Sequence, residues 1–265
     1  MLGEEFAMQC AFRGDKLFLT GRSSERLELL TQRIKGKYPD CQIITCDCML
    51  DSDASRARLY EFIDLKGVRF SRFIGVAGVD TQMAFEKYTQ ESALFQMRVN
   101  FEANVALTEY LLKKREKDFG ILIVSSICGA CPMPYFAVYS ATKSALVNFY
   151  TALRAELKGK GIKVSVLMPG SIPTRSDIIE DIKIQGWRGK LSSRSKEQVV
   201  KEALDRAEKN RRIIIPGAFN KMTYALTRIM PQGVVTRFVA RNWKNKEKNA
   251  FCEKKAVYNE KEDTK

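Results

Sequence analysis

Short apolar runs alternate with amphipathic stretches along most of this chain, and that alternation limits the folds open to it. The apolar runs predict strands at 16–20, 42–45, 72–76, 120–124, 163–167 and 212–215. Apolar residues at helical spacing predict helices near 4–12, 24–35, 53–64, 91–116, 136–158 and 195–209. Apolar strands joined by helices form a parallel sheet that is covered on both faces. The pattern therefore predicts an α/β fold, a doubly wound parallel sheet in a single domain.

The two ends of the chain differ from this alternation. Residues 1–216 carry the predicted domain, but they open on a helix, although the first strand of a doubly wound dinucleotide-binding sheet is its central one. Residues 217–246 interleave large apolar residues with basic ones, which predicts a basic amphipathic extension. Lys, Glu and Asn dominate residues 247–265, which predicts a charged, disordered tail.

The sequence contains no histidine, and this limits the chemistry that it can carry. Catalytic sets that need histidine are excluded, as are zinc sites built on it. Proton transfer near neutral pH must therefore use Tyr, Lys, Cys, Asp or Glu with a shifted pKa. The net charge of +14 raises the question of a nucleic-acid partner. The basic residues are spread along the whole chain without an aromatic-basic motif, so we predict no nucleic-acid binding.

The cysteines favour a reducing, cytoplasmic location. They are Cys10, Cys41, Cys46, Cys48, Cys128, Cys131 and Cys252. Their odd number and the lack of a recognisable signal peptide argue against a disulfide framework. Cys128 and Cys131 have the spacing of a redox pair, but without a second such pair we predict no metal site and interpret both as small apolar residues. No apolar run reaches ~18 residues, so we predict no membrane-spanning helix.

Tyr139 and Lys143 stand four residues apart, which places both side chains on one face of a helix. A nearby ammonium stabilises phenolate and lowers the pKa of a phenol below its usual value of ~10. Such a pair can exchange a proton without histidine. Tyr110 and Lys114 have the same spacing, but no strand precedes Tyr110, and we interpret that copy as an ordinary amphipathic surface.

The surroundings of Tyr139 distinguish it from this second copy. Ser126 follows a predicted strand and lies thirteen residues before Tyr139. Pro169 and Gly170 follow the next predicted strand, about thirty residues after Tyr139. Because the carboxyl ends of parallel strands meet in one crevice, we expect Ser126, Tyr139 and the Pro169–Gly170 turn to converge there.

These ordered motifs, spread over residues 3–216, resemble those of the short-chain dehydrogenase/reductase family in its classical branch. The resemblance implies a Rossmann-like NAD(P)-binding catalytic domain that interconverts a small-molecule ketone and a secondary alcohol. It implies that Ser126 and Tyr139 hold the substrate, that Tyr139 passes the proton, and that Lys143 holds the nicotinamide ribose and favours the Tyr139 phenolate. It further implies that Asn100 supports a water relay to Lys143.

The same resemblance implies the cofactor-binding positions. These are Gly3, Arg22, Asp47, Ala77, Gly78, Tyr139, Lys143, Pro169, Gly170 and Thr174. Gly3 corresponds to the last glycine of the phosphate-binding loop, Asp47 to the adenine contact, and Thr174 to the residue that holds the carboxamide. Ala77 and Gly78 correspond to the end of the family's NNAG motif.

Arg22 bears on the choice of cofactor. Enzymes that use NAD place an acid at the end of the strand before it, to bind the ribose 2′-hydroxyl. Here Gly21 stands at that place and Arg22 follows, so a 2′-phosphate meets a guanidinium that can pair with it. The sequence thus predicts NADP(H) in preference to NAD(H). The alternative is that Arg22 and Arg26 are solvated charges at a helix start.

The chain departs from the family pattern at three places. Residues 74–78 lack both asparagines of NNAG, Cys128 and Cys131 lie near the site, and the first strand and two loop glycines have no counterpart. Loss of a central strand unpairs its neighbours, which a stability of about 5–15 kcal/mol cannot absorb. Either this chain is truncated at its N-terminus and inactive as printed, or it is a non-catalytic binding or regulatory protein on the same fold. Because every catalytic match is retained, we favour truncation.

The substrate and the partners are left open by these motifs. Residues 176–194 are apolar enough to form a lid over a lipophilic substrate, or else a helix that packs on the core. Their large apolar members include Ile178, Ile179, Ile182, Ile184 and Trp187. Residues 217–246 either make a peripheral membrane contact or close the substrate cleft. The resemblance implies a homodimer or a tetramer, assembled through the helices near 91–116 and 136–158.

Overall fold

The computed structural model of this chain describes residues 1–174 and 176–244. Its strands are β1 (Leu17–Gly21), β2 (Ile43–Asp47), β3 (Phe70–Gly75), β4 (Arg115–Val124), β5 (Ile162–Leu167) and β6 (Ile213–Ile214). Its α-helices are α1 (Leu2–Phe12), α2 (Ser24–Lys37), α3 (Asp53–Lys66), α4 (Gln90–Met97), α5 (Ala103–Lys113), α6 (Ala137–Glu156), α7 (Ser176–Ile184), α8 (Gly186–Ser192), α9 (Lys196–Glu208), α10 (Ala218–Ile229) and α11 (Gln232–Trp243). Three short helical segments are η1 (Phe85–Lys87), the π-helical η2 (Arg98–Glu102) and η3 (Ile127–Ala130).

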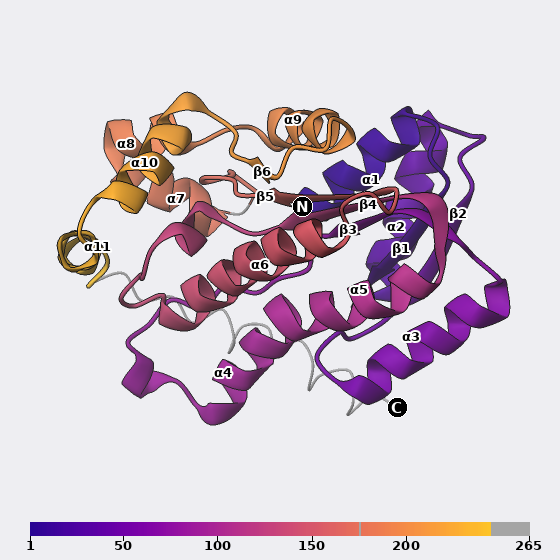
Figure 1. The fold of residues 1–265 in the computed structure, drawn as a ribbon, viewed down its shortest axis with the longest axis horizontal. Helices are drawn as coiled ribbons and strands as arrows, with labels where there is room; N and C mark the ends of the chain where they lie inside the picture. Colours follow the sequence, from indigo (N-terminus) through magenta and orange to yellow (C-terminus); the bar gives the residue numbers. More distant parts are fainter. Residues whose placement is uncertain (175, 245–265) are drawn as a thin grey trace.

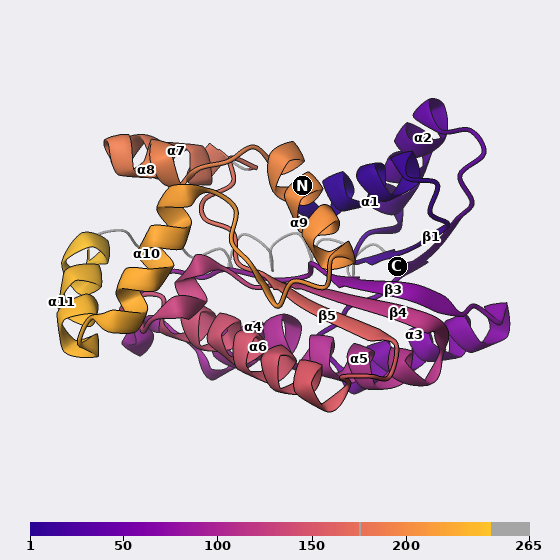
Figure 2. The same ribbon diagram turned by 45° about the horizontal axis from the view of Figure 1, so that its top comes forward.

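The strands are parallel and the helices lie on both sides of them, as the alternation of the sequence predicts (Figure 1). Helices α3, α5 and α6 cover one face, whereas α1, α2 and α9 cover the other (Figure 2). Buried side chains such as Leu146 and Tyr150 of α6 pack on β4 and β5 from the first side. Leu204 of α9 and Phe6 of α1 pack from the second side. The predicted fold class is confirmed.

Short polar side chains begin four of these helices. Ser23, Ser52, Thr89 and Ser195 are the N-caps of α2, α3, α4 and α9, and each side-chain oxygen accepts a hydrogen bond from the backbone amide three residues later. Gly67 ends α3 with a φ of 61°, a left-handed conformation that glycine adopts without strain. Local capping signals therefore place these helix boundaries.

The single helix predicted over 91–116 is wrong in two respects. The π-helical segment η2 interrupts it and divides it into α4 and α5. Its last residues belong to β4, because Arg115 pairs with Phe70 of β3 at a register irregularity. A π-helical turn inserts one residue into a helix, and apolar spacing alone does not reveal it.

The parallel strands form two sheets. In the described part of the chain, β1 pairs only with β2, while β3, β4, β5 and β6 form a four-stranded sheet in that order. The edges of β1 and β3 are bridged by side chains rather than by backbone hydrogen bonds: the rings of Phe18 and Phe70 lie 5.7 Å apart, and Arg72 pairs with Asp15 at 3.4 Å. The parallel strands are therefore divided between β1 and β3, and β3 is the strand that follows α3 in the chain.

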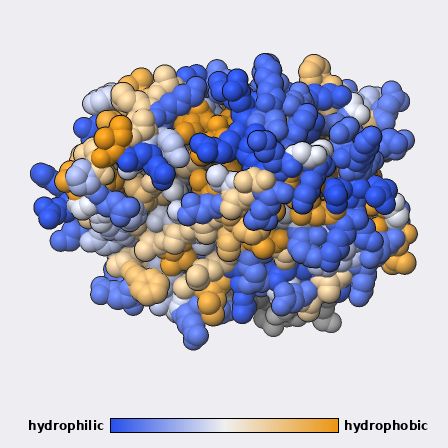
Figure 3. Space-filling view, in the orientation of Figure 1, coloured by the Kyte–Doolittle hydropathy of each residue, from blue (hydrophilic) through white to orange (hydrophobic). Residues whose placement is uncertain are grey.

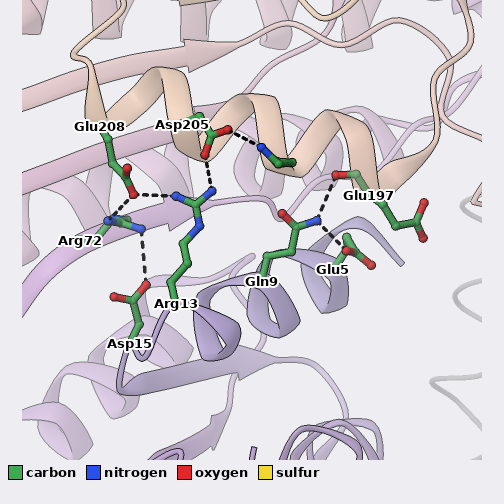
Figure 4. Close-up of polar contacts among 9 residues, drawn as sticks. Glu5, Gln9, Arg13, Asp15, Arg72, Glu197, Asp205 and Glu208 are labelled. Carbon is green, nitrogen blue, oxygen red and sulfur yellow. Dashed lines mark hydrogen bonds and ion pairs between the residues drawn. The ribbon is translucent and has the colours of Figure 1, made fainter. Parts of the chain in front are cut away.

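Helices α1 and α9 are held together by charged and polar side chains (Figure 4). Arg13, at the C-terminus of α1, contacts Asp205 at 2.5 Å and Glu208 at 2.7 Å. Gln9 donates from its Nε2 to the backbone oxygen of Glu197 at 3.0 Å. The pairing fixes the orientation of α1 on the sheet.

The C-terminal helices form one end of the molecule. Helices α7 and α8 lie beside α10, and α11 follows at the outer edge (Figures 1 and 2). Ile179, Ile184 and Trp187 are exposed, whereas Ile178 and Ile182 are partly buried, so both interpretations of residues 176–194 stay predictions. The predicted tail over 247–265 and Cys252 lie outside the described residues.

Candidate active site

Lys143 and Tyr139 lie one turn apart near the start of α6. Lys143 is only 4% exposed, and its Nζ donates a hydrogen bond to the backbone oxygen of Val124 at 3.0 Å. The same nitrogen lies 5.6 Å from the centre of the Tyr139 ring. Burial lowers the pKa of Lys143 from 10.5 to about 8, although the charges of Asp80 and Cys128 oppose that change. The structure therefore holds a buried amine beside a half-buried phenol.

Asn100 and Gly78 complete the surroundings of this amine. Asn100 is fully buried in η2; its Oδ1 accepts from the amide of Val79 at 2.7 Å, and its Nδ2 donates to Thr142 Oγ1 at 3.2 Å. A Cβ added at Gly78 would lie 3.2 Å from Lys143 Nζ and 3.4 Å from Asn100 Oδ1. Gly78 therefore lets the chain after β3 pass directly over the amine. Short π-helical segments occur frequently at functional sites.

Ser126 follows β4 and caps η3. Its Oγ accepts a hydrogen bond from the amide of Cys128 at 3.2 Å. The next amide, of Ile127, donates to the backbone oxygen of Pro169 at 3.0 Å. A Cβ added at Gly129 would lie 2.7 Å from the carbonyl carbon of Lys143. The carboxyl ends of β4 and β5 and the start of α6 are thus joined by direct contacts.

The segment after β5 lies at the same edge of the sheet, against Ser192 of α8 and Asn220 of α10. Gly170 has no room for a side chain, because an added Cβ would lie 2.5 Å from the backbone oxygen of Ser192 and 2.6 Å from Asn220 Nδ2. Thr174 turns back on this segment: its backbone amide donates to the oxygen of Ile172 at 2.7 Å. Pro169, Gly170 and Thr174 therefore lie in one fixed segment next to the Ser126 loop.

A second group of predicted residues lies at the ends of β1 and β2. Gly21 is the register partner of Asp47, and the backbone oxygen of Gly21 accepts from the amide of Cys48 at 2.8 Å. Arg22 and Asp47 are both exposed at this edge. Gly3 lies between the two groups, since a Cβ added to it would be 4.0 Å from Val76, two residues before Gly78.

These positions fit the two ends of a dinucleotide. The exposed guanidinium of Arg22 beside Asp47 suits the adenosine end, and the Lys143–Tyr139 pair suits the nicotinamide end. Between them, Gly3 in the first turn of α1 and exposed Ala77 leave the chain free of bulky side chains.

Three residues near this site are not part of the predicted set. Asp80 interacts electrostatically with Lys143. The ring of Phe136 lies 4.8 Å from that of Tyr139, and Trp243 at the end of α11 stacks on Phe136 at 5.8 Å. The positions of Asp80 and Phe136 in the sequence do not indicate that they lie near the site. Trp243 is recognisable from the sequence only as a large apolar residue of the basic extension.

The second Tyr–Lys pair has different surroundings. Tyr110 donates from its hydroxyl to Asp64 Oδ1 at 2.6 Å, and its ring stacks on that of Tyr60 at 4.0 Å. Burial, together with the hydrogen bond to the Asp64 carboxylate, raises the pKa of Tyr110. Lys114 pairs with the same carboxylate at 2.7 Å. This pair joins α5 to α3, and its phenol is held in the protonated form.

The described cysteines are free thiols. Burial raises the pKa of Cys128 to about 11 and also raises that of Cys131. A thiol with a raised pKa is a poor nucleophile and a poor metal ligand near neutral pH. In residues 1–174 and 176–244 no group of three or more Cys, Asp or Glu side chains could hold a metal ion.

A parallel α/β sheet with a buried Lys and a Tyr at the carboxyl ends of its strands defines a class of nicotinamide-dependent oxidoreductases. A sequence model of the family described as short chain dehydrogenase matches residues 2–182. An 11-beta-hydroxysteroid dehydrogenase-like 4A protein of Arabidopsis thaliana is 26% identical over 242 residues, which are 89% of this chain and 79% of that protein.

Solved structures show the same fold. A structure of a 7beta-hydroxysteroid dehydrogenase has a TM-score of 0.76 at 18% identity, over 90% of this chain and 92% of that chain. An angucycline C-6 ketoreductase with bound NADP has a TM-score of 0.71 at 17% identity, over 81% of this chain and 89% of that chain. The chain belongs to the short chain dehydrogenase family. It is an oxidoreductase that acts on CH–OH and C=O groups.

Proposed function

We propose that this chain is an NADP(H)-dependent oxidoreductase that interconverts a carbonyl and a secondary alcohol on a lipophilic substrate. Tyr139 is the general acid and base, Ser126 binds the substrate oxygen, and Lys143 holds the cofactor ribose and stabilises the phenolate. The observation that carries the proposal is the buried amine of Lys143, which lies 5.6 Å from the centre of the Tyr139 ring. Ser126 follows β4 at the same edge of the sheet.

The proposed chemistry divides between the cofactor and the side chains. When bound, the cofactor supplies or accepts the hydride. In the direction of reduction, the Tyr139 hydroxyl donates its proton to the carbonyl oxygen, to which Ser126 Oγ also donates a hydrogen bond. The positive charge of Lys143 then stabilises the phenolate. Asn100 is the proposed link in the proton path to Lys143, because it is buried and its side chain binds Val79 and Thr142, the chain neighbours of Gly78 and Lys143.

Arg22 supports NADP(H) over NAD(H). It follows β1 directly, it is exposed, and no acidic residue stands between the end of β1 and the start of α2. A guanidinium at this place attracts a 2′-phosphate, while the carboxylate usual in NAD enzymes would repel it. The NADP-bound ketoreductase shares the fold and supports the same choice.

Aromatic rings beside Tyr139 support a lipophilic substrate. Phe136 and Trp243 form a stacked pair next to the proposed acid, so a substrate that reaches Tyr139 also meets the partly exposed ring of Trp243. The hydroxysteroid dehydrogenases among the similar proteins act on substrates of this character.

Free thiols at the described cysteines support a reducing, cytoplasmic location. Assembly of a homodimer or a tetramer through the helices near 91–116 and 136–158 stays a prediction.

The decisive experiment compares two tyrosines with the same sequence spacing to a lysine. Tyr139→Phe should lower turnover of a ketone with NADPH by about 10²–10⁴-fold, because the phenol supplies the substrate proton. NADPH binding should persist, since the ring and Lys143 are retained. Tyr110→Phe, which removes the hydrogen bond to Asp64, should leave turnover unchanged.

Near-normal turnover by the Tyr139→Phe protein would contradict the assignment of Tyr139 as the acid.

A further inference from the structure

Helices α10 and α11 both expose large apolar side chains. Met222, Leu226 and Ile229 follow one another at helical spacing on α10, and Ile229 is 81% exposed. Val234 and Phe238 are exposed on α11. Hydrophobic surface gathers at the end of the molecule where α8 and α10 lie, whereas the end that carries α1 and α2 is mainly hydrophilic (Figure 3). We define these five side chains as the apolar face.

The charges on α10 and α11 have one sign. Residues 217–244 contain five basic residues and neither Asp nor Glu. These basic residues are Lys221, Arg228, Arg237, Arg241 and Lys244, all exposed. Helix α8 adds Arg188, whose guanidinium lies 5.6 Å from the Phe238 ring and 5.4 Å from the Trp187 ring. Large apolar side chains on helices whose charged residues are all basic have the composition of an interfacial membrane helix.

We propose that α10, α11 and the exposed side of α8 dock on the surface of an anionic lipid bilayer. The basic side chains would meet the headgroups, each contributing about 1 kcal/mol near an anionic surface. The apolar face would enter the boundary between headgroups and acyl chains. The proposed contact is peripheral. No helix in the described part of the chain is long and apolar enough to cross a bilayer.

Charge argues for a bilayer over a second copy of this chain. A two-fold contact through the apolar face would bring the same basic side chains of both copies together, and like charges at close range oppose association. An anionic lipid surface carries the opposite sign across its whole area. The proposal does not depend on the proposed function, because it rests on α8, α10 and α11 alone.

Co-sedimentation of the full chain with vesicles tests the proposal. We expect binding to vesicles of phosphatidylserine and phosphatidylcholine that weakens as salt is raised, and little binding to phosphatidylcholine alone. Ile229→Asp should weaken binding about tenfold or more, because it places a charge where an apolar side chain would be buried. Leu65→Asp on α3 is the matched control, since Leu65 is 86% exposed and lies on another part of the surface.

Three outcomes would overturn the proposal. One is the absence of sedimentation with anionic vesicles, and another is equal loss of binding in Ile229→Asp and Leu65→Asp proteins that both retain the wild-type circular dichroism spectrum. The third is a dimer in sedimentation equilibrium that Ile229→Asp dissociates, which would assign the apolar face to a second copy. An Arg228→Glu and Arg237→Glu double variant that loses only the anionic preference would support the proposal.

Discussion

Arg22 is exposed directly after β1, at the place where the proposed function puts the 2′-phosphate of the cofactor. We expect Arg22→Asp to shift the ratio of kcat/KM values for NADPH and NADH toward NADH by about tenfold or more, because a carboxylate repels a 2′-phosphate and accepts from a ribose hydroxyl. Lys37→Asp at the other end of α2 makes the same change of charge and should leave the ratio unaltered. An unchanged ratio in the Arg22→Asp protein would place the 2′-phosphate elsewhere.

Lys143 couples folding to pH. Its pKa is about 8 in the folded chain against 10.5 ordinarily, so between these values the unfolded chain binds the extra proton. Stability therefore rises with pH in this window, by up to about 3 kcal/mol at 1.36 kcal/mol per pKa unit. Urea unfolding at pH 7.5 and pH 10 should show this gain as a difference between the unaltered chain and Lys143→Met.

The comparison with Lys143→Met is needed because buried thiols act in the opposite direction. Burial raises the pKa of Cys128 and that of Cys48 to about 11, so their contribution falls as pH rises through 9. Both proteins share the contribution of Cys48, whereas Cys128 is electrostatically coupled to Lys143, so the difference between the proteins reports the amine together with this coupling. Equal pH dependence of the free energy of unfolding in the two proteins would show that burial does not lower the pKa of Lys143.

The sequence distinguishes Tyr139 from Tyr110 through chain order, because Ser126 and a strand precede only Tyr139. Parallel topology then brings the strand ends together. Asp80 and Trp243 could not be predicted in the same way. Each approaches the site through contacts between segments far apart in the chain, and neither lies at a spacing that a helix or a strand would reveal.

At the scale of elements, periodicity predicts most helices and strands to within a few residues. It fails at η2, where one extra residue per turn carries Asn100 into the core although the apolar spacing continues. It also leaves open where α7 and α8 lie, since an apolar helix can face a core, a substrate or a lipid. The positions of η2, α7 and α8 depend on contacts with other segments of the chain, and apolar spacing in the sequence does not reveal those contacts.

The contact between α1 and α9 depends on Arg13, which is mostly buried between Asp205 and Glu208 (Figure 4). Arg13→Ala should lower the free energy of unfolding by about 1–2 kcal/mol, because it leaves two carboxylates without their shared partner. Lys113→Ala removes an exposed pair with Glu109 on α5 and should cost at most about 0.5 kcal/mol. Urea denaturation measures the free energy of unfolding of both variants. Equal losses would show that Arg13 contributes no more to stability than an exposed surface ion pair does.

For the whole molecule, the division of the sheet predicts uneven local stability. Strands β4 and β5 are paired on both sides, whereas β1 and β3 each have a partner on one side in the described chain. Hydrogen exchange followed by NMR should therefore find the slowest amides in β4 and β5, with alternate amides of β3 exchanging faster. Uniformly slow exchange along β3 would mean that its free edge is covered in solution.

The positions of the two tryptophans give the molecule two separate fluorescent probes. Trp243 stacks on Phe136 beside Tyr139, while Trp187 is 63% exposed on α8, next to Arg188 and Phe238. Indole emission moves to shorter wavelength when the ring leaves water. Replacing Trp187 by Phe leaves Trp243, which should respond when a substrate binds beside Phe136 and Tyr139, and replacing Trp243 by Phe leaves Trp187, which should respond when the outer helices meet lipid. Light from a single chain can thus tell occupancy of the site apart from contact with a surface.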